Sequence, residues 1–372
     1  MAASSSRIAV RRPIAIAAVA AALTVTAASA QSPPAEMGPV KAEQFYKNVQ
    51  VFKGLPAEQV MPAMYFISSA LGVDCGFCHV EDRTIDTSMK AIARRMIQMT
   101  ASINNNAFNG GASVSCHTCH RGSAHPPSAL PADDAAHFPR VATIASHGSQ
   151  VESMPSPAEL VERYMTALGG PAALTKYSTM AATGTATDID GRAFPLEVLS
   201  KPGGRLVVRS RPKDAIPVSY TGKTGWLVDY ANHLRQMRLD EVEAAALEDG
   251  VWAPAQLLEL LVEPTVDGIE QIDGDDVYVV SGRTAYLPQV RLSFDKASGL
   301  LRRLEYFTDA AVGRFPVQFD VEKHTVVDGV RVPSRWVVTE IRRRRWTYQL
   351  DNLMPGAAIP DSRFVMPATH EH

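Results

Sequence analysis

The sequence predicts a multidomain protein, with a mainly α-helical domain first and an α+β domain built on an antiparallel sheet after it. Three observations support this fold class. The chain has 372 residues, which favours two domains over one. All four cysteines fall between residues 75 and 119, in a segment that favours helices. From about residue 190 onward, short runs of alternating apolar residues are separated by turn signals, as is typical of antiparallel strands.

Composition limits the classes of function. Hydrophobic residues make up 46% of the chain and charged residues 20%, which is the balance of a folded protein and not of a disordered one. The formal net charge is −2, so there is no electrostatic case for binding nucleic acid. Four cysteines are too few to hold a chain of this length together as a disulfide framework.

Residues 1–30 have the features of a secretory signal peptide. A basic start precedes the apolar run 14–25, and Ala28-Ser29-Ala30 matches the pattern of small residues at a cleavage site. The run is shorter than the roughly 20 residues that span a bilayer. The alternative is an uncleaved anchor. We therefore expect a periplasmic, exported protein that is soluble or held at a membrane peripherally, through a partner.

The rest of the chain divides by composition. Residues 31–43 are polar and rich in proline, and we expect a leader without regular structure. Residues 44–122 contain every cysteine and form the predicted helical domain. Residues 123–157 are rich in Pro, Ala, Ser and His, which predicts a linker. Residues 158–367 form the predicted β-rich domain.

The β-rich domain is expected to open with one helix. Ser156 is a good N-cap, with proline next and Glu159 placed to reach back, and Gly169-Gly170 ends the helix. Asp-Gly pairs at 190–191, 273–274 and 328–329 predict turns. A helical insert is expected at 240–263. The predicted strands cover 194–200, 204–210, 224–229, 276–282, 288–295, 300–307, 315–323 and 330–341.

The four cysteines lie in two copies of one pattern, which carries the chemistry. The copies are Cys75-Gly76-Phe77-Cys78-His79 and Cys116-His117-Thr118-Cys119-His120. Cys-x-x-Cys-His is the attachment pattern of haem c. Two thiols one helical turn apart can form thioethers to one haem, and the histidine on the same turn can coordinate its iron. The sequence thus predicts two covalently bound haem c groups, one on Cys75 and Cys78, the other on Cys116 and Cys119.

Three other readings of the cysteines are weaker. A thioredoxin-like redox pair needs a strand before the motif and a βαβ context, and neither is evident. A four-cysteine zinc site needs closer pairs than the 37 residues (79–115) between Cys78 and Cys116 allow, and it leaves both histidines unused. Two disulfides are the remaining alternative.

Methionines supply candidates for the second axial position of each iron. Met61 and Met64 lie three residues apart before the first motif, and Met96 and Met99 lie three apart before the second. Each pair shares a helical face, so the spacing leaves the choice within each pair open. Methionine can also simply fill gaps in a core. His/Met ligation raises the reduction potential of a haem.

Three arginines near the motifs could pair with haem propionates through bidentate hydrogen bonds. The alternative is that they lie on a solvated helix face. They are Arg94, Arg95 and Arg121.

The segments QVMPAMYFISSALGVDCGFCHVEDR, KAIARRMIQMTASIN and VSCHTCHRG, within roughly residues 44–123, resemble the photosynthetic reaction centre cytochrome c subunit family. In that family each haem is attached at Cys-x-x-Cys-His, and a methionine on the preceding helix is the sixth ligand. The resemblance implies the iron ligand pairs His79 with Met64 and His120 with Met96. Members commonly carry four haems, whereas this chain has motifs for two and then changes to the β-rich region.

Residues 158–367 loosely resemble LolA-like lipoprotein-carrier domains. That resemblance rests on the order of elements, one helix followed by many strands, and on a few turn positions. It implies that the antiparallel sheet is curved into a half-barrel.

The expected function is one-electron transfer by an exported di-haem cytochrome that is not an enzyme. The expected partners are a redox protein donor and acceptor, with a membrane-bound complex among the candidates, and no small-molecule substrate is evident. One alternative is a di-haem peroxidase-type enzyme, which needs one iron with an open position. Another is a ligand- or partner-binding β domain with the haems as redox sensor. Its cavity candidates are Trp226, Tyr230, Phe294 and Trp336.

Overall fold

The computed structural model describes residues 40–126, 154–176, 178–210, 215–228, 233–310, 312–341 and 344–367. The predicted signal peptide, residues 31–39 of the predicted leader and most of the predicted linker therefore lie outside the described residues. These three predictions, and the domain boundaries drawn from them, stay predictions.

The cysteine-containing part is helical. Its longest helix, α3, begins after Thr87, whose hydroxyl accepts a hydrogen bond from the Lys90 amide at 3.1 Å. Helix α2 ends at Gly72, which has a φ of 66° and adopts the left-handed conformation that glycine favours. The elements are α1 (Ala42–Phe45), η1 (Ala57–Gln59), α2 (Val60–Leu71), η2 (Cys75–Phe77), α3 (Ser88–Ala107) and α4 (Cys116–His120).

The remaining chain forms one antiparallel sheet of 13 strands in the order β6-β5-β4-β3-β2-β1-β13-β12-β11-β10-β9-β8-β7. The strands are β1 (Met180–Thr187), β2 (Ala193–Lys201), β3 (Gly204–Ser210), β4 (Ala215–Tyr220), β5 (Gly225–Val228), β6 (Leu234–Gln236), β7 (Val262–Ile272), β8 (Asp275–Arg283), β9 (Gln289–Asp295), β10 (Leu301–Ala310), β11 (Gly313–Val327), β12 (Val330–Ile341) and β13 (Arg344–Pro355). Helices α5 (Pro157–Leu168), α6 (Pro171–Lys176) and α7 (Leu239–Asp249) and the short helices η4 (Pro254–Gln256) and η5 (Asp361–Phe364) complete it.

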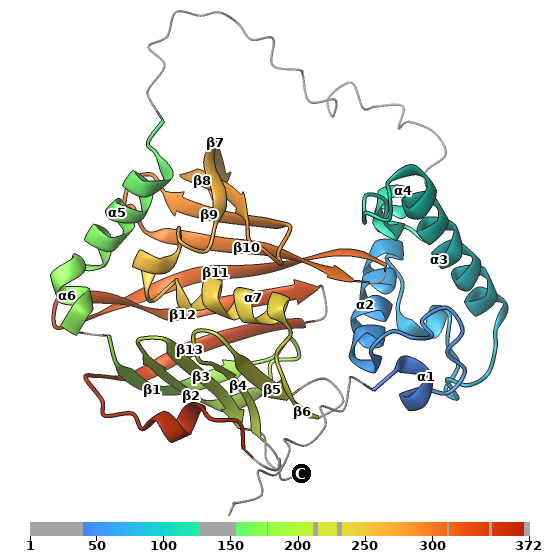
Figure 1. Cartoon of the computed structure of the whole chain (residues 1–372), viewed down its shortest axis with the longest axis horizontal. Helices are drawn as coiled ribbons and strands as arrows, with labels where there is room; N and C mark the ends of the chain where they lie inside the picture. The colour runs from blue at the N-terminus through green and yellow to red at the C-terminus, as the bar shows by residue number, and fades with distance from the viewer. Residues whose placement is uncertain are drawn as a thin grey trace, which may run out of the picture. The chain divides into compact units, whose positions relative to one another are not determined.

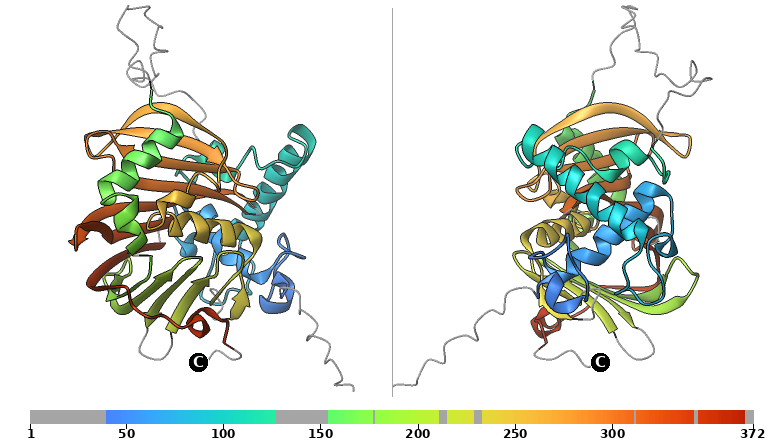
Figure 2. Two further views of the ribbon diagram at one scale, coloured as in Figure 1. Left: turned by 60° about the vertical axis from the view of Figure 1, so that its left-hand side comes forward. Right: turned by 90° about the vertical axis from the view of Figure 1, so that its right-hand side faces the viewer.

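The predicted antiparallel sheet with helices on a face is confirmed. Figures 1 and 2 show the strands bending around α7, with α5 along the same side. Tyr164 of α5 and Leu247 of α7 are buried in one apolar cluster with Trp336 of β12. The Tyr164 hydroxyl donates a hydrogen bond to the Val251 carbonyl at 2.6 Å, so its polar end is satisfied in the core.

The turn and cap predictions are confirmed in detail. In the turn between β7 and β8, Asp273 and Gly274 have φ values of 53° and 92°. Two positive φ values in a two-residue turn give the type I′ geometry that suits the twist of a hairpin. At the start of α5, the Ser156 hydroxyl accepts from the Glu159 amide, and the Glu159 carboxylate accepts from the Ser156 amide at 2.7 Å.

Two sequence expectations for this part fail. The helical insert predicted at 240–263 is wrong over its second half, because α7 ends at Asp249, η4 begins at Pro254 and β7 starts at Val262. Proline restricts the residue before it and removes an amide donor, which stops a continuous helix. Five strands were also not predicted from the sequence: β1, β4, β6, β7 and β13.

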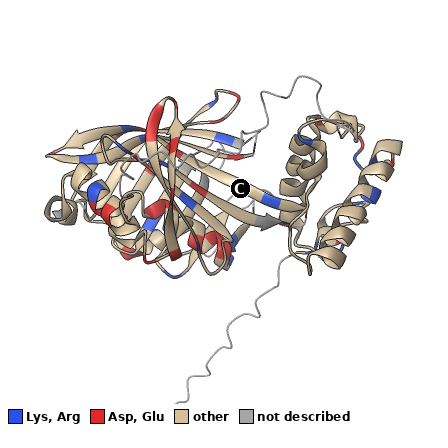
Figure 3. Cartoon of the chain, turned by 90° about the horizontal axis from the view of Figure 1, so that it is seen from above, with Lys and Arg blue, Asp and Glu red and all other residues tan. Residues whose placement is uncertain are grey.

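No described helix is both long enough and apolar enough to cross a membrane. Acidic and basic residues are interspersed along the described strands and helices (Figure 3). Pairs across neighbouring strands, such as Arg303 with Asp320 at 2.5 Å, account for part of this mixing.

Candidate haem sites

The first Cys-x-x-Cys-His motif forms a single tight turn. Asp74 precedes η2, and its carboxylate accepts a hydrogen bond from the Phe77 amide at 3.2 Å. The His79 amide donates to the Cys75 carbonyl at 3.0 Å. This turn holds the thiols of Cys75 and Cys78 and the imidazole of His79 close together, and both cysteines are free thiols.

A cavity of about 370 Å³ lies beside this turn. Cys75, Cys78 and His79 line one side of it, and Met61 and Met64 of α2 also face it. All four residues predicted around the first iron, Met64 included, therefore meet at one cavity. The choice between the two methionines stays open on geometry alone, because both line the wall.

The chain after the first motif is fixed to the start of α3. The Thr87 hydroxyl donates to the Cys78 carbonyl at 2.7 Å. The Lys90 ammonium group, on a residue only 8% exposed, donates to the carbonyls of Arg83 and Ile85 at 3.0 and 2.9 Å. The buried ammonium group thus has its hydrogen-bond partners within the loop that follows the first motif.

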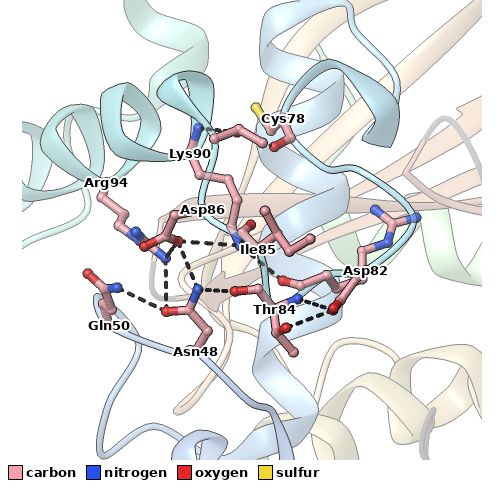
Figure 4. A network of polar contacts seen from close by, with 11 residues as sticks. Asn48, Gln50, Cys78, Asp82, Thr84, Ile85, Asp86, Lys90 and Arg94 are labelled. Atoms are coloured by element: carbon pink, nitrogen blue, oxygen red, sulfur yellow. Dashed lines mark hydrogen bonds and ion pairs between the residues drawn. The ribbon is translucent and has the colours of Figure 1, made fainter.

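Asp86 anchors the same loop to two other segments (Figure 4). Its carboxylate accepts hydrogen bonds from Arg94 and Asn48, both at 2.8 Å. These bonds, first that from Arg94, lower the pKa of Asp86 to about 2. As a result Arg94 is held at the cavity wall together with Arg83 and Lys90.

Lys47 lines the same cavity, and these four cations suit a ligand with carboxylates at its edge, as haem has in its propionates. Of the three arginines considered from the sequence, Arg94 lines this cavity, whereas Arg95 and Arg121 are not among its lining residues.

The protonation states at the first motif favour haem over a thiol redox pair. Burial, followed by the charges of Arg83, Lys90 and Arg94, lowers the pKa of His79, so its imidazole is neutral and able to coordinate a metal. Burial and the neighbouring Cys75 raise the pKa of Cys78. A thioredoxin-like pair needs a lowered cysteine pKa, which is the opposite shift.

The donor set and the surroundings both fit a haem at the first motif. The Nδ1 atom of His79 is buried and has no hydrogen-bond partner within the described part of the chain. A buried polar atom without a partner indicates a group that the protein has still to receive. No three His, Cys, Asp or Glu side chains gather as a metal cluster among the described residues, so the four-cysteine zinc site is not formed there.

The second motif is held by α3. The side chain of Asn104 donates to the Val114 carbonyl at 2.8 Å and accepts from its amide at 2.9 Å. Ser115 then caps α4, and its amide donates to the Thr118 hydroxyl at 3.0 Å. His120 Nδ1 lies 2.9 Å from the Ser123 carbonyl oxygen, which can only accept. The proton is therefore on Nδ1, which leaves Nε2 free for a metal.

A second cavity of about 250 Å³ lies beside Cys116. Its walls include Thr100 and Asn104 of α3 and, from the sheet, Val312 and Gly313 at the β10–β11 turn. Burial raises the pKa of the Cys116 thiol, as at the first motif, while Cys119 is exposed.

The structure does not bring Met96 into this second cavity. Met96 is 37% exposed and Met99 45%, and with Ile92 and Ile103 they form an exposed apolar stripe on α3. The spacing of four, three and four residues places the four side chains on one helix face. An uncovered apolar face of this kind on the helix beside the second motif suits a flat apolar group such as a porphyrin.

Several residues that build the sites were missed from the sequence. Thr87 had a usable signal, since a threonine before a helical run is a common N-cap. The sequence carries no signal for the contacts of Asn104, Val312 and Gly313, because these contacts join distant segments. Among the cavity candidates of the sheet, Phe294 and Trp226 are buried in apolar clusters, Trp336 lines a cavity, and Tyr230 lies outside the described residues.

Comparison with known proteins supports the cytochrome assignment of the first part. Residues 10–168 match the family model of the photosynthetic reaction centre cytochrome C subunit. The chain is 38% identical over 152 residues to the photosynthetic reaction center cytochrome c subunit of Roseobacter denitrificans, which is 35% of this chain and 39% of the relative. It is 30% identical over 113 residues to that of Thermochromatium tepidum, covering 29% of this chain and 28% of the relative.

The chain thus spans well under half of the length of these relatives, and the likeness lies in its N-terminal part. The resemblance that the motifs predict is confirmed.

Solved structures resemble the sheet part. A LolA superfamily protein from Nitrosomonas europaea matches with 15% identity and a TM-score of 0.41, covering 57% of this chain and 98% of that one. An outer membrane lipoprotein-sorting protein domain from Vibrio parahaemolyticus matches with 13% identity and a TM-score of 0.39, covering 55% of this chain and 94% of that one.

Proposed function

We propose that this chain is an exported di-haem c-type cytochrome that carries out one-electron transfer. The first haem is bonded to Cys75 and Cys78, and its iron is coordinated by His79 and Met64. The second haem is bonded to Cys116 and Cys119, and its iron is coordinated by His120 and Met96.

One observation carries the proposal: the predicted thiols, imidazole and thioether of the first site all line one cavity, although they come from segments on both sides of Gly72. When bound, the haem supplies the one-electron chemistry. The chain contributes a neutral His79, a soft thioether that favours ferrous iron, and a wall that is apolar around Met61 and Met64. With both axial positions of an iron filled by protein, no site is open for a substrate.

For the second site, the free Nε2 of His120 and the exposed stripe with Met96 support the assignment. Haem c is attached to a protein after translocation, so a haem c protein needs an export signal. Residues 1–30 have the features of such a signal. The partners we propose are a redox protein donor and acceptor, which includes a membrane-bound complex, because the relatives are named as reaction centre subunits.

A redox titration followed by absorbance tests this function. We expect two one-electron transitions and, in the ferric protein, the weak long-wavelength band of sulfur-to-iron charge transfer. A high-spin ferric signal would instead show an open iron position and would favour the di-haem peroxidase alternative. Colourless protein would contradict both.

A second candidate function rests on a cavity of about 310 Å³ on the inner side of the sheet, lined by Tyr306 and Trp336 among others. A cavity of this size can hold a small ligand, and the haems would then report on its binding. The same titration, repeated with a neutral aromatic alcohol as probe, distinguishes this role, since only a sensor predicts a shift in potential on binding.

A further inference from the structure

Strands β10 and β11 extend beyond their neighbours in the sheet. The pairing of β10 with β9 stops at Phe307, and the pairing of β11 with β12 starts at Gln318. Among the described residues, 308–310 pair only with 313–315, and Pro316 and Val317 pair only with Phe307 and Tyr306. These residues form a two-stranded hairpin that leaves the sheet, and we name residues 308–310 and 312–317 the hairpin arm (Figure 1).

The tip of the hairpin arm is apolar in sequence, and Val312, which the structure describes there, is buried. The sequence of the tip, Ala310-Ala311-Val312-Gly313, differs from the Asp-Gly turns elsewhere in the sheet. Val312 is only 5% exposed, although turn tips are normally polar and solvated. A methyl group added to Gly274 or Gly329, in the Asp-Gly turns, would meet nothing within 4 Å. An apolar, buried tip indicates that another part of the chain packs over the hairpin arm.

The part of the chain that packs over the tip is the cysteine-containing helical part. Val312 and Phe315 belong to one buried apolar cluster with Phe52, Val60 and Ala63. The ring of Phe315 meets that of Phe66 on α2 edge to face, with centroids 5.1 Å apart. Burial of aromatic and branched side chains on this scale gives the contact a definite geometry.

Gly313 brings the hairpin arm against the second motif. A methyl group on its Cα would lie 2.9 Å from Cζ of Phe66 and 2.9 Å from Cβ of Ser115, the residue that caps α4 and precedes Cys116. Val312 and Gly313 also line the cavity beside Cys116. Every residue that lines the first cavity lies between positions 46 and 97, so the hairpin arm touches that site only indirectly, through the cluster with Phe52 and Val60.

We propose that the hairpin arm is a structural part of the second haem site: it positions Ser115 and Cys116 and closes the cavity of that thiol, whereas no described residue of the sheet lines the first cavity. Gly313 and Val312 are thus positioning residues for the second haem. The inference rests on the proposed haem function, and it adds that the sheet contributes lining residues to the cavity of one haem and not to that of the other.

The first test compares two glycine variants of the full chain after haem maturation. Gly313→Ala forces the hairpin tip away from Phe66 and Ser115. Gly268→Ala is the matched control, because Gly268 has nearly the same φ (150° against 145°) and open space around it. Mass analysis of the two motif peptides should show loss of haem from the second motif in Gly313→Ala, full haem on the first motif, and full haem on both in Gly268→Ala.

The second test uses a gentler variant and protein produced without haem. Val312→Ala removes two methyl groups from the cavity wall and keeps the backbone. Val326→Ala, near the other end of β11 and 62% exposed, is its control. The rate of alkylation of Cys116 should rise in Val312→Ala and stay unchanged in Val326→Ala, while that of Cys75 stays unchanged in both.

Equal loss of haem from both motifs in Gly313→Ala would overturn the inference, as would full haem on both. If Gly313→Ala does not fold, the alkylation rate of Cys116 in Val312→Ala becomes the deciding measurement. An unchanged rate in that variant overturns the inference. Failure of the proposed function looks different, because the unsubstituted protein would then carry no haem at either motif.

Discussion

Gly72 and Gly122 meet in a close backbone contact that joins the two cysteine motifs. Gly72 ends α2 just before the first motif, and Gly122 follows the second. A methyl group on Gly72 would lie 2.0 Å from the Gly122 carbonyl oxygen, and the Gly122 amide donates to the Ala70 carbonyl at 2.8 Å. Two backbones approach this closely only where side chains are absent. The spacing of the two motifs is therefore fixed by a backbone contact.

Gly72→Ala should destabilise this contact and both sites with it. Its φ of 66° already disfavours alanine, and the added methyl group must push the Gly122 carbonyl away. Overpacking of this kind costs about 1–3 kcal/mol, so we expect a lower thermal unfolding midpoint and partial haem loading. Gly122→Ala is the control, since its φ is also positive but its surroundings are open. Equal effects of the two variants would show that backbone conformation alone, and not the close approach, matters.

Met64→Leu tests the axial ligand of the first haem. Leucine conserves volume but lacks the thioether, so packing stays nearly intact while the iron loses its sixth ligand. We expect a lower midpoint potential for one of the two transitions and a ferric spectrum shifted toward high spin. Met61→Leu, on the same cavity wall, should change neither. The reverse pattern would assign the ligand to Met61.

Met96→Leu and Met99→Leu test the second haem in the same way. Both side chains are substantially exposed on α3, so neither substitution should change the free energy of unfolding by more than about 0.5 kcal/mol. Met96→Leu should convert the second haem toward high spin, and Met99→Leu should leave its spectrum unchanged. An unchanged spectrum in Met96→Leu would rule it out as a ligand.

Acid should release the loop beside the first motif. The pKa of Asp86 is lowered to about 2 by its bonds from Arg94 and Asn48, so the stabilisation is complete above its unfolded value near 3.8 and is lost as the pH falls toward 2. The unfolding midpoint of Asp86→Asn should lie below that of the unsubstituted protein at about pH 5, and the two should converge near pH 2. Parallel curves would contradict this role of Asp86.

Local signals in the sequence were enough for the parts of the fold that depend on neighbouring residues. The turn at Asp273-Gly274, the cap at Ser156 and the cysteine motifs each depend on a few adjacent residues, and their residue types alone predict their geometry. Most of the missed strands have weaker alternation: β1, for example, reads MAATGTAT and contains few large apolar residues.

Contacts between distant segments were beyond such reasoning. Val312 gave no signal of its role, because an apolar turn tip has meaning only once Phe66 and Ser115 are in place. The carboxylate of Asp86 is one of many on the surface, and only the approach of Asn48 and Arg94 makes it an anchor. The resemblance supplied Met64, and the cavity shows that it lies within reach of the first motif but does not separate it from Met61.

The mass of the intact protein, purified after export and measured under denaturing conditions, tests the central claim most directly. Covalent attachment predicts the mass of the processed polypeptide plus two haem groups, together with a red colour that survives denaturation. A mass equal to that of the bare polypeptide, or with one haem only, would contradict the proposal of two haems on Cys75, Cys78, Cys116 and Cys119.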